Sequence, residues 1–153
     1  MSLPFYTADD VRAAVSMQEA ISAMELAFSS ISNGNAVVPQ RINLPIDGFN
    51  AHHLSMPSYL KEGKYITIKL INVNHDNPSN GLDLINGVIV VMSAHNGECL
   101  ALIDGQYVTA LRTGAASGLA TKLLSNPNAS RAVIFGNGVQ ALTQIEAIRC
   151  VRD

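Results

Sequence analysis

A glycine-rich run near the end of the chain has the spacing of a dinucleotide-binding loop. The pattern G-x-G-x-x-G/A is matched by Gly136-Asn137-Gly138-Val139-Gln140-Ala141. The first glycine allows a tight turn, the second lets the backbone approach a pyrophosphate, and alanine in the third position still permits close helix packing. The phosphates would bind the free N–H groups where the next helix begins. The run therefore predicts an NAD or NADP site; a turn that uses glycine only for its backbone geometry is the alternative.

Three cations, Arg41, Lys69 and Arg112, lie in stretches with few other charges. A cation among apolar neighbours usually has a partner or a role. If the three converged in one cleft they would bind a carboxylate, because arginine offers a planar fork and lysine a point charge. Such a cleft would suit an amino acid or a keto acid. The alternative is that Lys69 points outward from a half-buried strand, Arg41 is a loop cation and Arg112 caps a turn.

The histidines and cysteines do not support a metal site. His52 and His53 are adjacent, so in an extended segment their side chains point to opposite sides and cannot ligate one metal. Cys99 and Cys150 lie far apart and have no other Cys or His at metal-ligand spacing. We interpret both cysteines as small, buried apolar residues.

The chain opens with a predicted pair of helices. Ser16 and Glu19 have the spacing of a capping box, and Gly34 ends the helix that follows. Apolar residues of this helix recur at steps of four and three on one face: Met17, Ile21, Met24, Phe28 and Ile31. A shorter helix precedes it, with Thr7 as its N-cap and acidic residues in its first turn.

Strand patterns fill the middle of the chain. Residues 65–71 alternate in polarity and are rich in β-branched side chains, which predicts a strand. Residues 86–93 and 99–103 are apolar runs that flank an Asn96-Gly97 turn, which predicts an antiparallel hairpin. Residues 72–81 are rich in turn-forming residues and predict a loop.

A predicted helix over residues 109–125 has a surface of very small side chains. These are Gly114, Ala115, Ala116, Gly118 and Ala120. We expect another element to pack closely against them. Pro127 ends this helix, and residues 131–135 have the pattern of a buried strand that leads into Gly136. The only candidate domain boundary therefore lies between residues 125 and 126. Beyond it there is room for one βα unit of a doubly wound sheet.

The composition, 153 residues with 48% hydrophobic residues and a formal net charge of −2, is that of a globular protein. The near-neutral charge and the lack of a basic run argue against a nucleic-acid partner. No apolar run approaches the roughly 20 residues that a membrane span needs, and the first ten residues lack the layout of a secretory signal. We therefore expect no membrane association and a cytoplasmic location.

Taken together, these segments resemble the ornithine cyclodeaminase/mu-crystallin family almost from end to end. The most specific matches are Thr109-Ala110-Leu111-Arg112-Thr113 and the glycine loop with Gln140. The other matching segments are Pro39-Gln40-Arg41, Met56-Pro57, Lys69, Asn77-Pro78, Gly81-Leu82, Gly97-Glu98 and Leu102-Ile103-Asp104-Gly105. Their order and spacing make the resemblance specific.

The resemblance implies a chain of two parts. Residues 1–125 would be an α+β substrate-binding and dimerisation domain with a mostly antiparallel sheet, and residues 126–153 the first βα unit of a Rossmann-type α/β domain. The resemblance also implies that Arg41, Lys69 and Arg112 bind the substrate carboxylate, and that Thr113 lies near the cofactor cleft. A homodimer formed through the N-terminal sheet is implied as well.

Members of this family use a nicotinamide cofactor to move a hydride to or from the carbon that bears an amine or imine. The resemblance therefore implies an NAD(P)-dependent enzyme of small amino or imino acids, acting by deaminating cyclisation, ketimine reduction or amino-acid dehydrogenation. Its proton-handling aspartate matches no position in this sequence, so we expect an inactive fragment of such an enzyme. The alternative is a short protein without catalysis that acts as a small-acid binding or dimerisation module.

Overall fold

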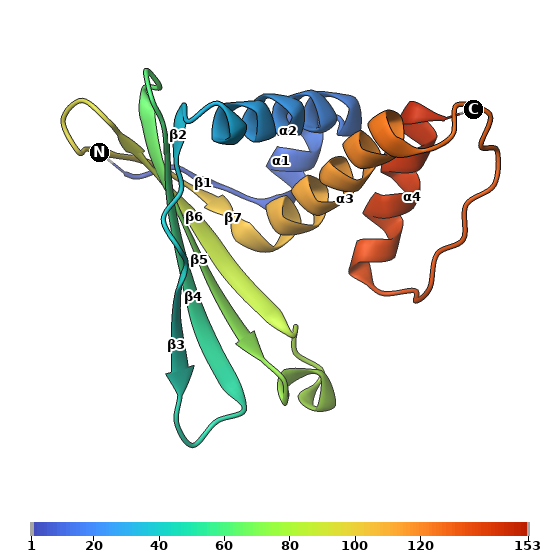
Figure 1. Cartoon of the computed structure of the whole chain (residues 1–153). Coiled ribbons are helices and arrows are strands. Elements are labelled where there is room, and N and C mark those ends of the chain that lie inside the picture. Colours follow the sequence, from blue (N-terminus) through green and yellow to red (C-terminus); the bar gives the residue numbers. More distant parts are fainter. Residues whose placement is uncertain (1, 153) are drawn as a thin grey trace.

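The computed structural model describes residues 2–152 and places one curved sheet beside a group of helices (Figure 1). The strands are β1 (Phe5–Tyr6), β2 (Ala36–Val37), β3 (Ile42–Ile46), β4 (Ala51–Leu60), β5 (Tyr65–Asn74), β6 (Ile85–Ser93) and β7 (Cys99–Asp104). The helices are α1 (Ala8–Ala14), α2 (Met17–Ser32), α3 (Gly105–Leu124) and α4 (Val139–Val151), with a 3-10 turn at Asn77–Asn80.

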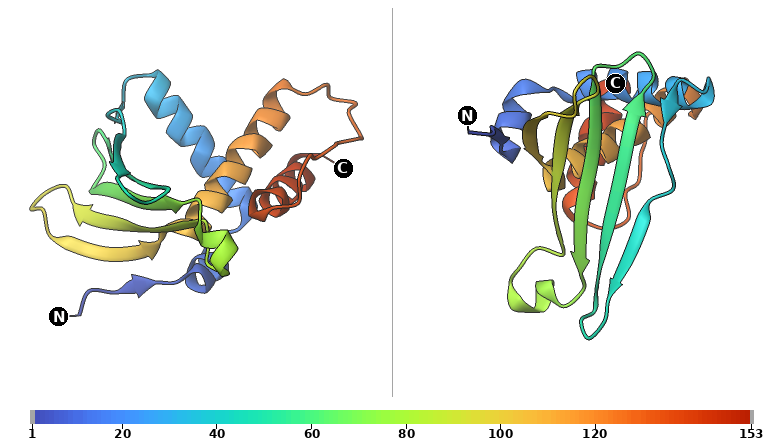
Figure 2. Two further views of the ribbon diagram at one scale, coloured as in Figure 1. Left: turned by 90° about the horizontal axis from the view of Figure 1, so that it is seen from below. Right: turned by 90° about the vertical axis from the view of Figure 1, so that its left-hand side faces the viewer.

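The sheet has seven strands in the order β1-β7-β6-β5-β4-β2, and β3 also pairs with β4. Strand β1 runs parallel to β7, whereas the other pairings are antiparallel. The helices lie on one side of this sheet, so that its other face is open to the viewer in the right-hand view of Figure 2. The predicted α+β fold with a mostly antiparallel sheet is confirmed.

Both predicted helix starts are confirmed by their side-chain caps. The hydroxyl of Thr7 accepts a hydrogen bond from the backbone N–H of Asp10, and Ser16 and Glu19 form the second capping box. The predicted apolar face of α2 is buried only near its start. Met17 and Ile21 belong to the core with α3 and α4, whereas Phe28 and Ile31 are exposed because the second half of α2 extends past those helices (Figure 2).

The predicted hairpin is present, with residues 94–98 joining β6 to β7. The predicted strand at residues 65–71 continues to Asn74 as β5, so the loop expected from residue 72 begins later. The interpretation of both cysteines as buried was wrong. Cys99 and Cys150 are exposed, because Cys99 is the first residue of β7, directly after the hairpin turn, and Cys150 lies on the outer side of α4.

Helix α3 begins four residues earlier than expected, at Gly105, because the Asp104 carboxylate accepts a hydrogen bond from the backbone N–H of Tyr107 at 2.6 Å. The expectation that its small residues admit a close neighbour is confirmed, and the neighbour is α4. A Cβ atom placed on Gly114 would lie 2.5 Å from the carbonyl oxygen of Thr143. The two helices therefore meet with backbone against backbone.

The far ends of α3 and α4 are tied together by Arg152, which follows α4. Its guanidinium donates hydrogen bonds to the Ser125 hydroxyl at 2.7 Å and to the Thr121 carbonyl at 3.0 Å. These acceptors lie at the C-terminal end of α3, where the guanidinium also reaches the Lys122 carbonyl, one of the last carbonyl groups of the helix, at 3.4 Å. Arg152 thus caps α3 while fixing the end of α4.

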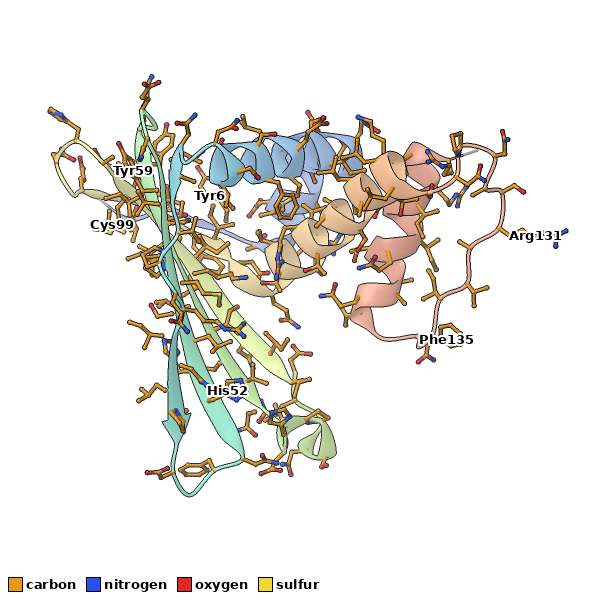
Figure 3. The ribbon with its side chains drawn as sticks, in the orientation of Figure 1. Tyr6, His52, Tyr59, Cys99, Arg131 and Phe135 are labelled. Atoms are coloured by element: carbon orange, nitrogen blue, oxygen red, sulfur yellow. The ribbon has the colours of Figure 1, made fainter. Side chains whose placement is uncertain are left out.

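The strand predicted at residues 131–135 does not form. This segment is irregular, and Val133 and Phe135 are 78% and 95% exposed; Figure 3 shows Arg131 and Phe135 on its outer side. A strand is held by hydrogen bonds to a neighbouring strand, and within residues 2–152 none lies beside this segment. The helix predicted after the glycine loop does form, as α4.

Residues 2–152 contain neither a candidate membrane span nor a candidate metal cluster. No described helix combines the length and apolar character needed to cross a membrane. In the same part of the chain, no group of three or more His, Cys, Asp or Glu side chains is arranged to hold a metal ion.

Candidate functional site

The glycine loop presents backbone N–H donors, which no side chain caps, at the start of α4. Gly136 has a φ of +97°, a conformation that favours glycine, and Gly138 is the N-cap of α4 without any side-chain cap. A Cβ atom added to Gly138 would meet nothing within 4 Å, so the approach to the helix start is open. Free N–H groups and the positive end of the helix dipole favour a phosphate at such a place. The geometry fits a dinucleotide pyrophosphate.

The loop forms one wall of a cleft of about 400 Å³. The facing wall is the start of α3, including Gln106, Thr109 and Ala110, and the segment before β6 closes one end through Asp83. Of the residues predicted to bind the cofactor, four line this cleft: Gly136, Gly138, Val139 and Gln140.

The two other predicted cofactor residues, Asn137 and Thr113, are not part of the cleft lining. Thr113 lies one turn beyond Thr109 on α3, and its hydroxyl donates a hydrogen bond to the Thr109 carbonyl at 2.6 Å. Its side chain is therefore committed to its own helix. Asn137 is exposed between the two loop glycines.

Lys69 lies in the middle of β5, between Met56 of β4 and Ile89 of β6. Its half-buried ammonium group lies 3.5 Å from the Thr109 hydroxyl, which joins the sheet to the cleft wall. Burial lowers the pKa of Lys69, and the positive charge of Arg112 lowers that pKa further. The ion pairs among residues 2–152 are formed elsewhere, by Arg12 with Asp9 and by Lys122 with Glu25.

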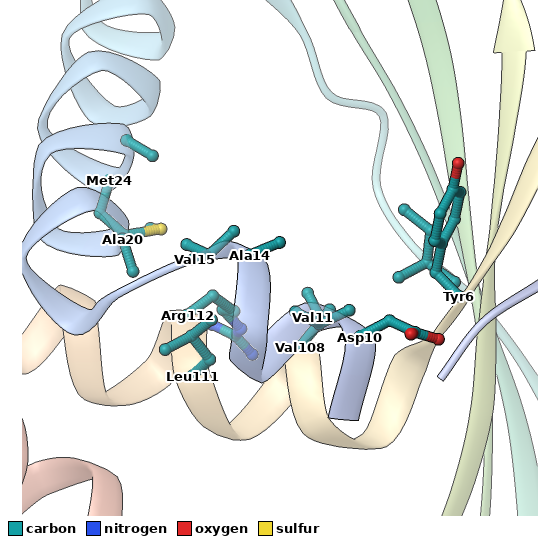
Figure 4. A pocket seen from close by; sticks show the side chains of 12 residues that line it. Tyr6, Asp10, Val11, Ala14, Val15, Ala20, Met24, Val108, Leu111 and Arg112 are labelled. Carbon is teal, nitrogen blue, oxygen red and sulfur yellow. The ribbon is translucent and has the colours of Figure 1, made fainter. Parts of the chain in front are cut away.

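Arg112 follows Thr109 by one helical turn, so both project from the same side of α3. Arg112 is exposed and lines two mainly apolar hollows, one of about 380 Å³ beneath α1 and α2 and one of about 570 Å³ between α2 and the strands β4 and β5. Figure 4 shows it on the α3 wall of the first hollow, facing Val11 and Val15. It does not line the glycine-loop cleft.

Arg41 is the most distant of the three cations. It directly precedes β3, and the first residue of β3, Ile42, pairs with Ser55 of β4. The next residue of β4, Met56, pairs with Lys69 of β5. Extending the register by one residue places Arg41 on the same face of the sheet as Lys69, two strands or about 10 Å away. The fold thus brings Lys69 and Arg112 together, and sets Arg41 on their face of the sheet.

Thr109 is the residue that sequence reasoning missed. The predicted helix began at residue 109, which put this threonine at a helix end. In the structure it lies within the second turn of α3, three residues before Arg112, and contacts Lys69. The predicted helix over residues 109–125 already put Thr109 and Arg112 on one face, and this spacing is the signal that could have identified Thr109.

The sequence profile of the "Ornithine cyclodeaminase/mu-crystallin family" matches residues 3–153, and the chain belongs to this family. A Delta(1)-pyrroline-2-carboxylate reductase of Bacillus cereus is 37% identical over 147 residues, which are 96% of this chain and 45% of the reductase. The alanine dehydrogenase of Archaeoglobus fulgidus is 36% identical over 96% of this chain and 44% of that enzyme.

Solved structures agree with this assignment. The Delta(1)-pyrroline-2-carboxylate reductase of Thermococcus litoralis, in complex with NADH and L-proline, superposes with a TM-score of 0.93 at 37% identity. The match covers 98% of this chain and 46% of that structure. The chain therefore spans less than half the length of the relatives it matches.

Proposed function

We propose that this chain is part of an NAD(P)-dependent enzyme that transfers a hydride at the amine- or imine-bearing carbon of a small amino or imino acid. Such a transfer would serve ketimine reduction or deaminating cyclisation. One observation carries the proposal: the contact of Lys69 with Thr109 sets a half-buried cation beside a cleft that fits a dinucleotide. The similarity to a Delta(1)-pyrroline-2-carboxylate reductase and to an alanine dehydrogenase supports the same class of reaction.

Different residues would bind the cofactor and the substrate. Backbone N–H groups from Gly138 to Gln140 would hold the cofactor phosphates, and the nicotinamide, when bound, supplies or accepts the hydride. Lys69 and Arg112 would neutralise the substrate carboxylate and fix its orientation, with Arg41 approaching from the edge of the sheet. We further propose residues 1–125 as the substrate-binding and dimerisation domain and residues 126–153 as the start of the NAD(P)-binding domain, with turnover a property of the whole protein.

Replacing Arg112 with alanine tests the carboxylate assignment. In the whole enzyme, Arg112→Ala should raise the KM for the amino or imino acid about tenfold, because the substrate loses one charged hydrogen-bond donor that lies in an exposed position. The KM for the dinucleotide should change far less. Steady-state kinetics with each substrate varied in turn measure both constants, and an equal loss for the two ligands would reject the assignment.

We propose that two copies of the chain pair through the open face of the sheet. That a related archaeal alanine dehydrogenase is a dimer with bound NAD supports pairing of two copies, and the face is inferred from this chain's own residues. Ile42 and Leu44 pair with Ser55 and His53, so they point away from the Lys69 face, and they are 62% and 57% exposed. Exposed apolar side chains gathered on one sheet face are typical of an interface.

A charge on this face should weaken the dimer. Leu44→Lys introduces one unpaired ammonium group from each subunit into an isologous interface, and we expect the dimer dissociation constant to rise about tenfold. The matched control is Leu124→Lys, at an 84% exposed position at the end of α3. Sedimentation equilibrium of both variants measures the effect. Equal dissociation constants would place the interface elsewhere.

A further inference from the structure

The hydroxyl of Thr109 is a hydrogen-bond acceptor without a free proton. Its single proton is donated to the Gly105 carbonyl oxygen at 2.6 Å, within α3. The remaining lone pairs of the oxygen face the Lys69 ammonium, which lies 3.5 Å away. A threonine in this state can only accept, and therefore favours a charged ammonium over a neutral amine.

Thr109 also lies where two walls of the site meet. It lines the cleft of the glycine loop, while its contact with Lys69 reaches across from α3 to β5. Among residues 2–152, Thr109 provides the hydrogen-bond acceptor for this half-buried lysine, and no carboxylate forms an ion pair with it. Both neighbours of Lys69 in the sheet, Met56 and Ile89, are apolar.

We propose that Thr109 is a positioning residue, whose acceptor-only hydroxyl holds the Lys69 ammonium at the cofactor side of the carboxylate site. The proposal rests on the function proposed above. Without this acceptor the ammonium has no protein group to orient it, because its strand neighbours are apolar. The substrate carboxylate would then bind a lysine that is less often charged and less well directed.

The pKa of Lys69, followed by NMR in the full chain with labelled lysine side chains and no ligand, tests this role directly. The Lys69→Arg variant, which lacks this signal, assigns it. Thr109→Val removes the acceptor at constant shape, and should lower the pKa of Lys69 further, whereas Thr109→Ser should retain the wild-type pKa. A purely structural role predicts the opposite sign, since a loosened helix would expose Lys69 and return its pKa towards the ordinary value. That result, or no change, would overturn the proposal.

Thr113→Val is the matched control. Thr113 makes the same hydrogen bond to its own helix, at the same 2.6 Å, but has no lysine partner. Its replacement removes a comparable hydroxyl from α3 and should leave the pKa of Lys69 unchanged. A shift as large as that of Thr109→Val would assign the effect to the helix and overturn the proposal.

Affinity for L-proline, measured by calorimetry, connects this role to binding. Thr109→Val should weaken the affinity about tenfold, and Thr109→Ser by much less, because a hydrogen bond to a charged group is lost only in the valine variant. Unchanged affinity in Thr109→Val, with wild-type binding present, would overturn the positioning role. If the wild-type chain itself binds no L-proline, the proposed carboxylate site fails, whereas the ligand-free pKa still decides whether Thr109 orients Lys69.

Discussion

Replacing Lys69 with methionine should lower kcat/KM for the amino or imino acid about 100-fold in the whole enzyme. Methionine nearly matches the length of the lysine stem, so packing between Met56 and Ile89 is kept while the charge is removed. The loss should exceed that of Arg112→Ala, since a half-buried charge is screened less by water than an exposed one. Steady-state kinetics at saturating dinucleotide give the value.

Lys61→Met provides the control for this substitution. Lys61 is exposed just after β4 and takes part in neither the cleft nor the two apolar hollows. Its variant should retain the wild-type kcat/KM. If Lys69→Met and Lys61→Met are equally active, Lys69 does not bind the carboxylate.

Gly114→Ala should destabilise the protein by roughly 2 kcal/mol, the cost typical of overpacking a close contact. The direction of the change in stability is informative, because helix propensity alone would make alanine more stable than glycine by about 1 kcal/mol. Here the added Cβ would lie 2.5 Å from the Thr143 carbonyl oxygen and 2.7 Å from its carbonyl carbon. Backbone atoms cannot yield as a flexible side chain can, so α4 must move away from α3. Chemical denaturation measures the change in the free energy of unfolding.

Ala120→Val controls for altered side chains on the same helix. Ala120 is exposed, and valine there should cost less than about 1 kcal/mol through helix propensity alone. Limited proteolysis of the segment 126–138 gives a second measurement, since separation of α4 from α3 should accelerate cleavage there in Gly114→Ala only. A Gly114→Ala protein as stable as the wild type would show that the helices do not pack as described.

Most helix starts and turns could be predicted from the sequence, because each depends on residues that are close together in the chain. The caps at Thr7 and Ser16 and the Asn96-Gly97 hairpin depend on residues within a few positions of each other. The strand predicted at residues 131–135 has an equally clear pattern, but a strand depends on a distant neighbour. Val133 and Phe135 are exposed, which shows that an apolar sequence pattern does not form a strand when no neighbouring strand lies beside it.

The candidate site was predictable in its parts but not in its assembly. The glycine loop could be found from spacing, and Lys69 and Arg112 from their apolar surroundings. That Lys69 meets Thr109, 40 residues away in sequence, follows from how α3 crosses the sheet, which no local pattern encodes. Arg112, one turn further along α3 than Thr109, lines the apolar hollows and not the loop cleft, and this also required the three-dimensional arrangement.

Helix α3 sets the distance between the proposed carboxylate site and the proposed cofactor site. Near its start Thr109 touches the lysine of the sheet, and five residues later Gly114 rests on the helix that carries the glycine loop. At 1.5 Å per residue these two points are separated by about 7.5 Å of unbroken helix, with no hinge between them. One residue inserted in that interval would turn one ligand site against the other by about 100°. The distance between the two proposed sites is therefore set by the number of residues between Thr109 and Gly114.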